Sequence, residues 1–167
     1  MDKVCPIYGD ILEVGTGKGY FAVELAKRGY SFTSVDISSE EQEFARLNVE
    51  YFGLAKQVNF KIDNAENLSF KDKSFDVVFT INAIHHFAKP FKAMDEFIRV
   101  VKPKGKIVLS DFSEEGFKMI DKIHASEGRK HEAGKVTLAE IGDYLENKGF
   151  SIQKHKSKLE DIVVAIR

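Results

Sequence analysis

The chain has 167 residues, of which 43% are apolar and 31% are charged, and its formal net charge is −1. These values are typical of a globular domain, and the near-neutral charge disfavours nucleic acid as a substrate because no overall basic field is present to hold phosphates. The single cysteine, Cys5, excludes an internal disulfide and a cysteine metal cluster. No apolar run reaches the roughly 18 residues of a membrane span, and no signal sequence opens the chain. We therefore expect one cytoplasmic domain over residues 1–167, without membrane attachment.

A short strand, a glycine turn and a helix near the start of the chain form its organising region. The strand is predicted over residues 11–14 and contains Glu13, and a helical pattern continues to about Gly29. Between them, glycines occupy alternate positions: Gly15, Gly17 and Gly19. This order is the first half of a βαβ unit, in which side-chain-free backbone and free N–H groups approach a ligand. A tight turn in some other α/β protein is the alternative at this point.

The spacing of the glycines argues against a dinucleotide ligand. The fingerprint G-x-G-x-x-G needs a third glycine for close helix–strand packing, and Tyr20 occupies that position when the count starts at Gly15. Lys18 is the one basic residue in the turn, and Glu13 would repel a pyrophosphate. A nicotinamide oxidoreductase is therefore a disfavoured interpretation.

An acidic residue ends the second predicted strand, which spans residues 31–37. Asp36 lies about 20 residues after Gly15, where Rossmann-like sites place a carboxylate that accepts hydrogens from both hydroxyls of a ribose. The alternatives are a solvated loop residue or the N-cap of the next helix. Because Ser38 already supplies a capping side chain, we favour ribose binding at Asp36.

The rest of the chain alternates predicted strands and helices, which indicates an α/β sheet with a β-rich end. The predicted helices span residues 40–52, 90–101, 114–125 and 137–148, and the predicted strands span residues 58–62, 75–81, 106–110, 150–157 and 161–166. The first of these helices is predicted from an apolar stripe: Phe44, Leu47 and Tyr51. Residues 75–81 are almost continuously apolar, as expected of a central parallel strand covered on both faces. A turn is predicted at residues 103–105, and the polar loop at residues 126–135 is either a surface connection or a lid.

The pattern Glu-x-Gly-x-Gly-x-Gly at residues 13–19 resembles the first motif of the class I S-adenosylmethionine-dependent methyltransferases. The stretch from Arg99 to Leu109 resembles the passage between the fourth and fifth strands of that family, and the likeness extends over about residues 7–167. The resemblance implies an α/β, Rossmann-like three-layer sandwich. It also implies a mostly parallel, seven-stranded sheet in the order 3-2-1-4-5-7-6, with strand 7 antiparallel. Many relatives carry helices before the first strand that close over the ligand, and only about eight residues precede it here.

The resemblance further implies S-adenosyl-L-methionine as the cofactor and S-adenosyl-L-homocysteine as the product. Asp63, after the third strand, matches the position that faces the adenine amine, and a carboxylate accepts a hydrogen bond from such a donor. A turn-forming Asp–Asn pair is an equally open alternative there. Glu13 suits the ammonium of the methionine moiety. The predicted cofactor residues are Glu13, Gly15, Gly17, Gly19, Asp36, Ile37, Asp63, Asn64, Ala65 and Asn82.

Methyl transfer is an in-line displacement at a sulfonium, so the protein mainly aligns the nucleophile with the methyl carbon and excludes water. A general base is needed only if the acceptor must lose a proton. The candidates are His85, His86 and Asp111, with His124 and His131 as further possibilities near the polar loop. Alternatively, one of the adjacent histidines packs against the following helix, and Asp111 begins the next one. Adjacent histidines do not place two ligands on one helical face, so no metal site is predicted.

These features together predict a methyltransferase that acts on a small-molecule acceptor. The alternative is a cofactor-binding subunit that needs a partner protein for activity, and it is motivated by the short segment before the first strand. The acceptor atom and the oligomeric state, whether a homo-oligomer or a pairing with a partner subunit, stay open.

Overall fold

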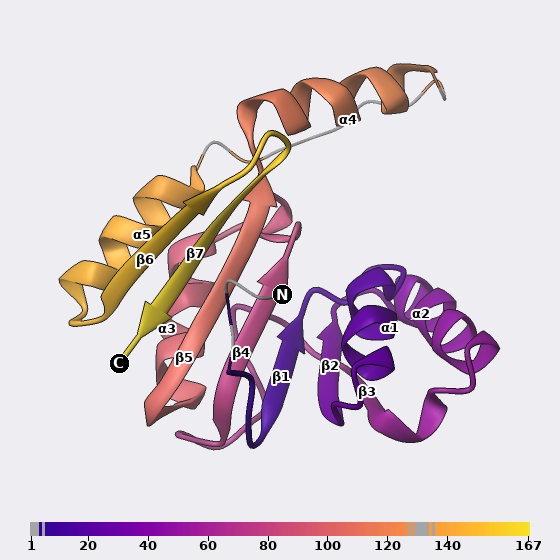
Figure 1. Cartoon of the computed structure of the whole chain (residues 1–167), viewed down its shortest axis with the longest axis horizontal. Coiled ribbons are helices and arrows are strands. Elements are labelled where there is room, and N and C mark those ends of the chain that lie inside the picture. The colour runs from indigo at the N-terminus through magenta and orange to yellow at the C-terminus, as the bar shows by residue number, and fades with distance from the viewer. Residues whose placement is uncertain (1–3, 5, 127, 129–133, 135) are drawn as a thin grey trace.

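The computed structural model describes residues 4, 6–126, 128, 134 and 136–167. Cys5, His131 and most of the polar loop at residues 126–135 therefore lie outside the described residues. One seven-stranded sheet forms the centre of the molecule (Figure 1). Its strands are β1 (Ile11–Val14), β2 (Phe32–Asp36), β3 (Val58–Ile62), β4 (Phe75–Ile81), β5 (Val101–Phe112), β6 (Ser151–Lys156) and β7 (Glu160–Ile166).

The sheet has the strand order β3-β2-β1-β4-β5-β7-β6, which confirms the predicted topology. β1 pairs in parallel with both β2 and β4, β2 pairs with β3, and β4 pairs with β5. β7 runs antiparallel to β5 and β6. All four residues of β1 are buried, because this strand lies between two neighbours and is covered on both faces.

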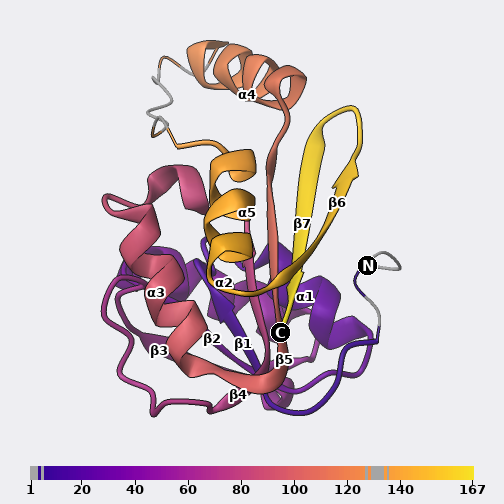
Figure 2. The same ribbon diagram turned by 90° about the vertical axis from the view of Figure 1, so that its left-hand side faces the viewer.

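Helices cover both faces of the sheet (Figures 1 and 2), as the predicted three-layer sandwich requires. The helices are α1 (Tyr20–Lys27), α2 (Ser39–Tyr51), α3 (Pro90–Val100), α4 (Glu114–Ser126) and α5 (Leu138–Asn147), with short 3-10 turns η2 (Ala55–Gln57) and η3 (Ile84–His86). One apolar core joins Leu25 of α1 to Phe79 of the sheet, and a second joins Phe97 of α3 and Leu145 of α5 to the opposite face. In both views α4 projects beyond the end of β5. Within the described part of the chain, every helix is too short or too polar for a membrane crossing.

The helix boundaries follow from local sequence. α1 begins directly after Gly19, whose φ of 79° is in the left-handed region, and it is followed by Gly29 with a φ of 86°. The Ser38 hydroxyl caps α2 by accepting a hydrogen bond from the Glu41 amide at 3.2 Å. Thr137 caps α5 in a complete capping box.

Two local predictions are wrong in detail. β5 begins at Val101, which pairs with Phe75, so residues 103–105 form an irregularity within a longer strand and not a turn before it. In α2, the apolar stripe that predicts the helix is not its buried face. Its buried residues are Gln42, Ala45 and Val49, whereas Phe44, Leu47 and Tyr51 are exposed. Small side chains bring α2 close to the sheet, and the Gln42 amide reaches the Lys61 carbonyl at 2.6 Å.

The glycines at the two ends of α1 provide a matched pair of substitutions. Both have left-handed φ angles, but a Cβ on Gly19 would lie 2.8 Å from the Ala45 Cβ, whereas a Cβ on Gly29 would meet nothing within 4 Å. We expect Gly29→Ala to cost about 1 kcal/mol of unfolding free energy through backbone strain alone. Gly19→Ala should cost about 1–3 kcal/mol more, because α1 and α2 must separate. Urea unfolding measures both, and equal losses would contradict the packing argument.

Candidate functional site

A cavity of about 830 Å³ lies at the carboxyl ends of β1, β2, β3 and β4. Ligands of open α/β sheets bind at this edge, where the strand order changes direction. The cavity brings together nine of the ten predicted cofactor residues: Glu13, Gly15, Gly17, Asp36, Ile37, Asp63, Asn64, Ala65 and Asn82. Gly19 is not among the lining residues, because it packs against Ala45 of α2.

The glycine turn presents backbone to the cavity. The amides of Gly15 and Thr16 donate to the Val35 carbonyl at 2.8 and 3.2 Å, which ties the turn to β2. A Cβ on Gly15 would lie only 2.5 Å from the Ala83 Cβ, so this position admits no side chain. A Cβ on Gly17, whose φ is 49°, would meet no protein atom within 4 Å. Because Gly17 lines the cavity, this open space lets a ligand approach its backbone closely.

Asp36 connects the glycine turn to the start of α2. Its Oδ2 accepts a hydrogen bond from the Gly17 amide at 2.8 Å, and its Oδ1 accepts one from the Ser38 amide at 2.9 Å. The N-cap role belongs to Ser38, as the capping argument predicts. A carboxylate offers about four acceptor positions, so about two of those on Asp36 remain for a ligand.

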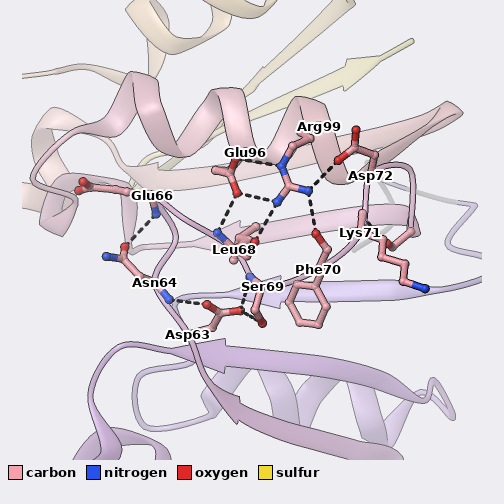
Figure 3. Close-up of polar contacts among 11 residues, drawn as sticks. Asp63, Asn64, Glu66, Leu68, Ser69, Phe70, Lys71, Asp72, Glu96 and Arg99 are labelled. Carbon is pink, nitrogen blue, oxygen red and sulfur yellow. Dashed lines mark hydrogen bonds and ion pairs between the residues drawn. The ribbon is translucent and has the colours of Figure 1, made fainter.

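Asp63 forms a turn with Asn64, which was the alternative to its predicted contact with the adenine amine (Figure 3). Its Oδ1 accepts from the Asn64 amide at 2.9 Å, and its Oδ2 accepts from the Ser69 amide at 3.0 Å and the Ser69 hydroxyl at 2.8 Å. These three bonds fold the chain after β3 so that residues 63–66 face the cavity. About one acceptor position on the carboxylate is left, so the turn and a contact with a base amine are compatible.

Glu13 is the most deeply buried acidic residue at the site, with 1% of its surface exposed. Its strand-register partner Ser34 donates to Oε2 at 2.5 Å, and the Ser34 hydroxyl lies 2.6 Å from that of Thr16. Burial, opposed by the Ser34 hydrogen bond, raises the pKa of Glu13 from its ordinary value of 4.5 to about 8. Glu13 is therefore mostly protonated at neutral pH, and a nearby cation would favour its ionised form.

The adjacent histidines after β4 lie in different surroundings. His86 lines the cavity, whereas His85 is buried and its Nδ1 lies 2.6 Å from Asp111 Oδ1. The two imidazole rings are in contact, with centroids 4.1 Å apart. Neither His85 nor Asp111 lines the cavity, so the structure brings these two candidates together but separates them from the space for a ligand. His124 of α4 lies at the cavity wall with His86.

Asn82 directly follows β4 in a strained conformation, with a φ of 52°. Its amide nitrogen donates to the Glu160 carboxylate at 3.2 Å, and its side-chain oxygen is buried without a donor. Strained residues of this kind concentrate at functional sites. The strain at Asn82 turns the chain from β4 towards the two histidines.

Among the described lining residues, acidic side chains outnumber basic ones. Lys18 is the one ammonium, and the carboxyl groups belong to Glu13, Asp36, Glu41, Asp63 and Glu66. Sequence reasoning missed Glu41, Glu66 and the Thr16–Ser34 link to Glu13, because these depend on strand register and on the shape of a loop. Among the described residues, no group of three His, Cys, Asp or Glu side chains is arranged to hold a metal ion.

The raised pKa of Glu13 makes folding stability depend on pH. Between about pH 4.5 and pH 8 the folded protein holds a proton that the unfolded chain has released, so the free energy of unfolding falls as the pH rises through this window. The loss is on the order of 3–5 kcal/mol. Glu13→Gln removes the titrating group while keeping its size. Urea unfolding of both proteins at about pH 5 and about pH 8 should show a shallower pH dependence for the variant, and parallel curves would contradict this assignment.

Comparisons with known proteins agree with this geometry. A family model described as a methyltransferase domain matches residues 12–109, which is more than half of the chain. The ubiquinone/menaquinone biosynthesis C-methyltransferase of Geotalea daltonii is 31% identical over 119 residues, which cover 70% of this chain and 51% of that protein. The norajmaline N-methyltransferase of Rauvolfia serpentina is 34% identical, over 62% of this chain and 36% of that protein. The chain thus spans about half the length, or less, of these curated relatives.

Solved structures give the same fold. The YcgJ protein of Bacillus subtilis superposes with a TM-score of 0.76 at 20% identity, covering 99% of this chain and 95% of that one. Its likeness concerns the fold alone, whereas the family model rests on the sequence. From the two together, we conclude that the chain belongs to the methyltransferase domain family and has the class I S-adenosylmethionine-dependent methyltransferase fold.

Proposed function

We propose that the chain forms a single S-adenosylmethionine-binding domain that transfers a methyl group to a small-molecule acceptor. The observation that carries this proposal is the combination of a bare glycine turn with a cavity lined by five carboxyl groups and one lysine. Even with Glu13 protonated, the other four carboxyl groups outnumber Lys18, so the lining attracts a cationic sulfonium and repels the pyrophosphate of a dinucleotide. The size of the cavity is in the range of about 300–1,000 Å³ that holds a small ligand.

The lining residues divide by the parts of the cofactor that they suit. Asp36 would accept from the ribose hydroxyls, and residues 63–66 would surround the base, with Asp63 accepting from its amine. The methionine end would lie between the glycine turn and Asn82, where Glu13 can balance its ammonium by giving up a proton. When bound, S-adenosylmethionine supplies a methyl group on a good leaving group. The protein then has to orient the acceptor and keep water away.

The acceptor would occupy the part of the cavity near His86, Phe87 and His124. An imidazole there can take a proton from a hydroxyl or an amine. His85 and Asp111 would contribute indirectly, because this buried pair packs against the ring of His86 and does not line the cavity. The named relatives methylate carbon in one case and nitrogen in the other, so the proposal is restricted to a small acceptor without an assigned acceptor atom.

Isothermal titration with S-adenosylhomocysteine tests the cofactor site. We expect Asp36→Ala to weaken binding about 10-fold or more, because it removes a charged hydrogen-bond acceptor. Gly17→Ala should weaken it as well, because a Cβ strains the left-handed backbone of a cavity-lining residue whose amide binds the Asp36 carboxylate. Gly29→Ala is the control, since it carries similar backbone strain at a residue that does not line the cavity. Unchanged affinity in both site variants would rule this site out.

The role of His86 is tested by separating binding from transfer. The purified protein is offered a panel of uncharged phenols and amines with S-adenosylmethionine labelled on its methyl group. We expect His86→Ala to keep the affinity for S-adenosylhomocysteine while slowing transfer to any acceptor that the wild type modifies by about 100-fold or more. A variant with full transfer activity would remove His86 from the mechanism.

A second function is favoured by one observation. α2 packs against Gly19 of the glycine turn and carries an exposed apolar stripe, with Phe44 47%, Leu47 54% and Tyr51 84% exposed. Such a surface is typical of a protein interface, which suits a cofactor-binding subunit that needs a partner protein. Methyl transfer by the pure chain alone would exclude this alternative, whereas cofactor binding without any transfer across the panel would favour it.

A further inference from the structure

The chain between β3 and β4 supplies one wall of the cavity. This segment, residues 63–74, is called the β3–β4 loop here, and its first residues, 63–66, line the cavity. An isolated bridge between Asn64 and Asn67 is its one β-type pairing in the described structure. The amides of Asn64, Glu66 and Ser69 bond side chains of the loop itself, whereas the Leu68 amide and the Leu68 and Phe70 carbonyls bond groups outside it.

Two side chains of α3 provide those partners (Figure 3). Arg99 donates from Nη2 to the Leu68 carbonyl at 2.9 Å and from Nη1 to the Phe70 carbonyl at 2.7 Å. Glu96 accepts from the Leu68 amide at 2.8 Å. One turn of α3 thus fixes three backbone groups of the loop directly after its cavity-lining part.

The Arg99 guanidinium is fully used in this arrangement. It forms a two-point pair with Glu96, from Nε to Oε1 at 2.9 Å and from Nη2 to Oε2 at 2.7 Å, and Nη1 also meets Asp72 Oδ1 at 2.9 Å. With the two carbonyl contacts, all five N–H donors of the group have an acceptor. The Arg99 hydrogen bond holds the pKa of Glu96 below its usual range, so this carboxylate stays ionised at neutral pH. A lysine has three donors and no planar fork, so it cannot reproduce the set.

The other end of α3 holds the same loop. Glu66, a cavity-lining residue, accepts from the Lys89 amide at the start of α3 at 2.8 Å. Ala65 and Leu68 are buried in the same apolar core as Met94 of α3. α3 therefore binds the loop at both of its ends: the start of the helix bonds Glu66 of the wall, and Glu96 and Arg99 bond the residues that follow the wall.

We propose that Arg99, acting with Glu96, is a positioning residue for the cofactor: it sets the place of the base-binding wall without touching the ligand. This inference rests on the proposed function and deepens it. It assigns Arg99, in the stretch that resembles the family's passage before the fifth strand, a role in recognition of the adenine base as well as in the fold.

The test compares two ligands that differ only at the base. S-adenosylhomocysteine carries the amine that Asp63 would bind, and S-inosylhomocysteine carries an oxygen in its place. We expect the wild type to prefer the adenine ligand. Arg99→Met should weaken S-adenosylhomocysteine about 10-fold or more and bring the two affinities closer together, because the wall loses its fixed place. Arg99→Lys and Glu96→Gln should also weaken S-adenosylhomocysteine binding and reduce the preference for the adenine ligand, but both effects should be smaller.

Asp72→Ala is the matched control. It removes one contact of Arg99 at a side chain that is 71% exposed, and it leaves the backbone contacts in place, so both affinities should stay within about twofold of the wild type. Loss of base preference is a change that a merely less stable protein would not show. If Arg99→Met does not fold, the affinity and the base preference of Arg99→Lys and Glu96→Gln test the role of Arg99 instead.

The outcomes separate this inference from the function on which it rests. Folded variants that keep both the affinity and the base preference of the wild type would overturn the role of Arg99 and leave the cofactor site intact. A wild type that binds neither ligand would overturn both.

Discussion

The bond from the Gly17 amide to the Asp36 carboxylate, at 2.8 Å, is the contact on which the site depends. It joins the turn after β1 to the end of β2, so the glycine backbone and the carboxylate face one hollow. The second oxygen of Asp36 accepts from the Ser38 amide, and the Ser38 hydroxyl caps α2. Sheet topology places the strand ends together, but this carboxylate fixes how the two turns face each other. The remaining acceptor capacity of Asp36 is the basis of the proposed ribose contact.

Electrostatics then selects the kind of ligand. Charged side chains on the cavity wall are mostly acidic, and the deepest of them, Glu13, is kept neutral by burial with a pKa of about 8. A buried acid of this kind can balance the charge of an approaching ammonium by releasing its proton. Without a bound cation it stays neutral, so the site holds no unpaired buried charge at Glu13. A pyrophosphate would instead keep Glu13 protonated, and the other acidic side chains of the lining would repel it. The same lining therefore favours S-adenosylmethionine over a nicotinamide dinucleotide.

Much of the fold was predictable from sequence because local patterns and global topology agree. The glycine turn, the strand-end aspartates and the apolar β4 fall in register with the family pattern, and the sheet order is confirmed. The irregular start of β5 was not predictable, since Val101 pairs with Phe75 across a break in register. The buried face of α2 was not predictable either, because the small residues Ala45 and Val49 are buried there while the larger Phe44 and Leu47 are exposed. The contacts that hold the β3–β4 loop could not be predicted from the sequence, since Arg99, which bonds the loop, is distant from it along the chain.

A crystal structure of the protein with S-adenosylhomocysteine would show where the nucleoside binds. We expect the ribose hydroxyls within hydrogen-bond distance of the Asp36 carboxylate, the base against residues 63–66, and the homocysteine end between the glycine turn and Asn82. A ligand bound elsewhere on the sheet, or bound in this cavity with its ribose away from Asp36, would contradict this expectation.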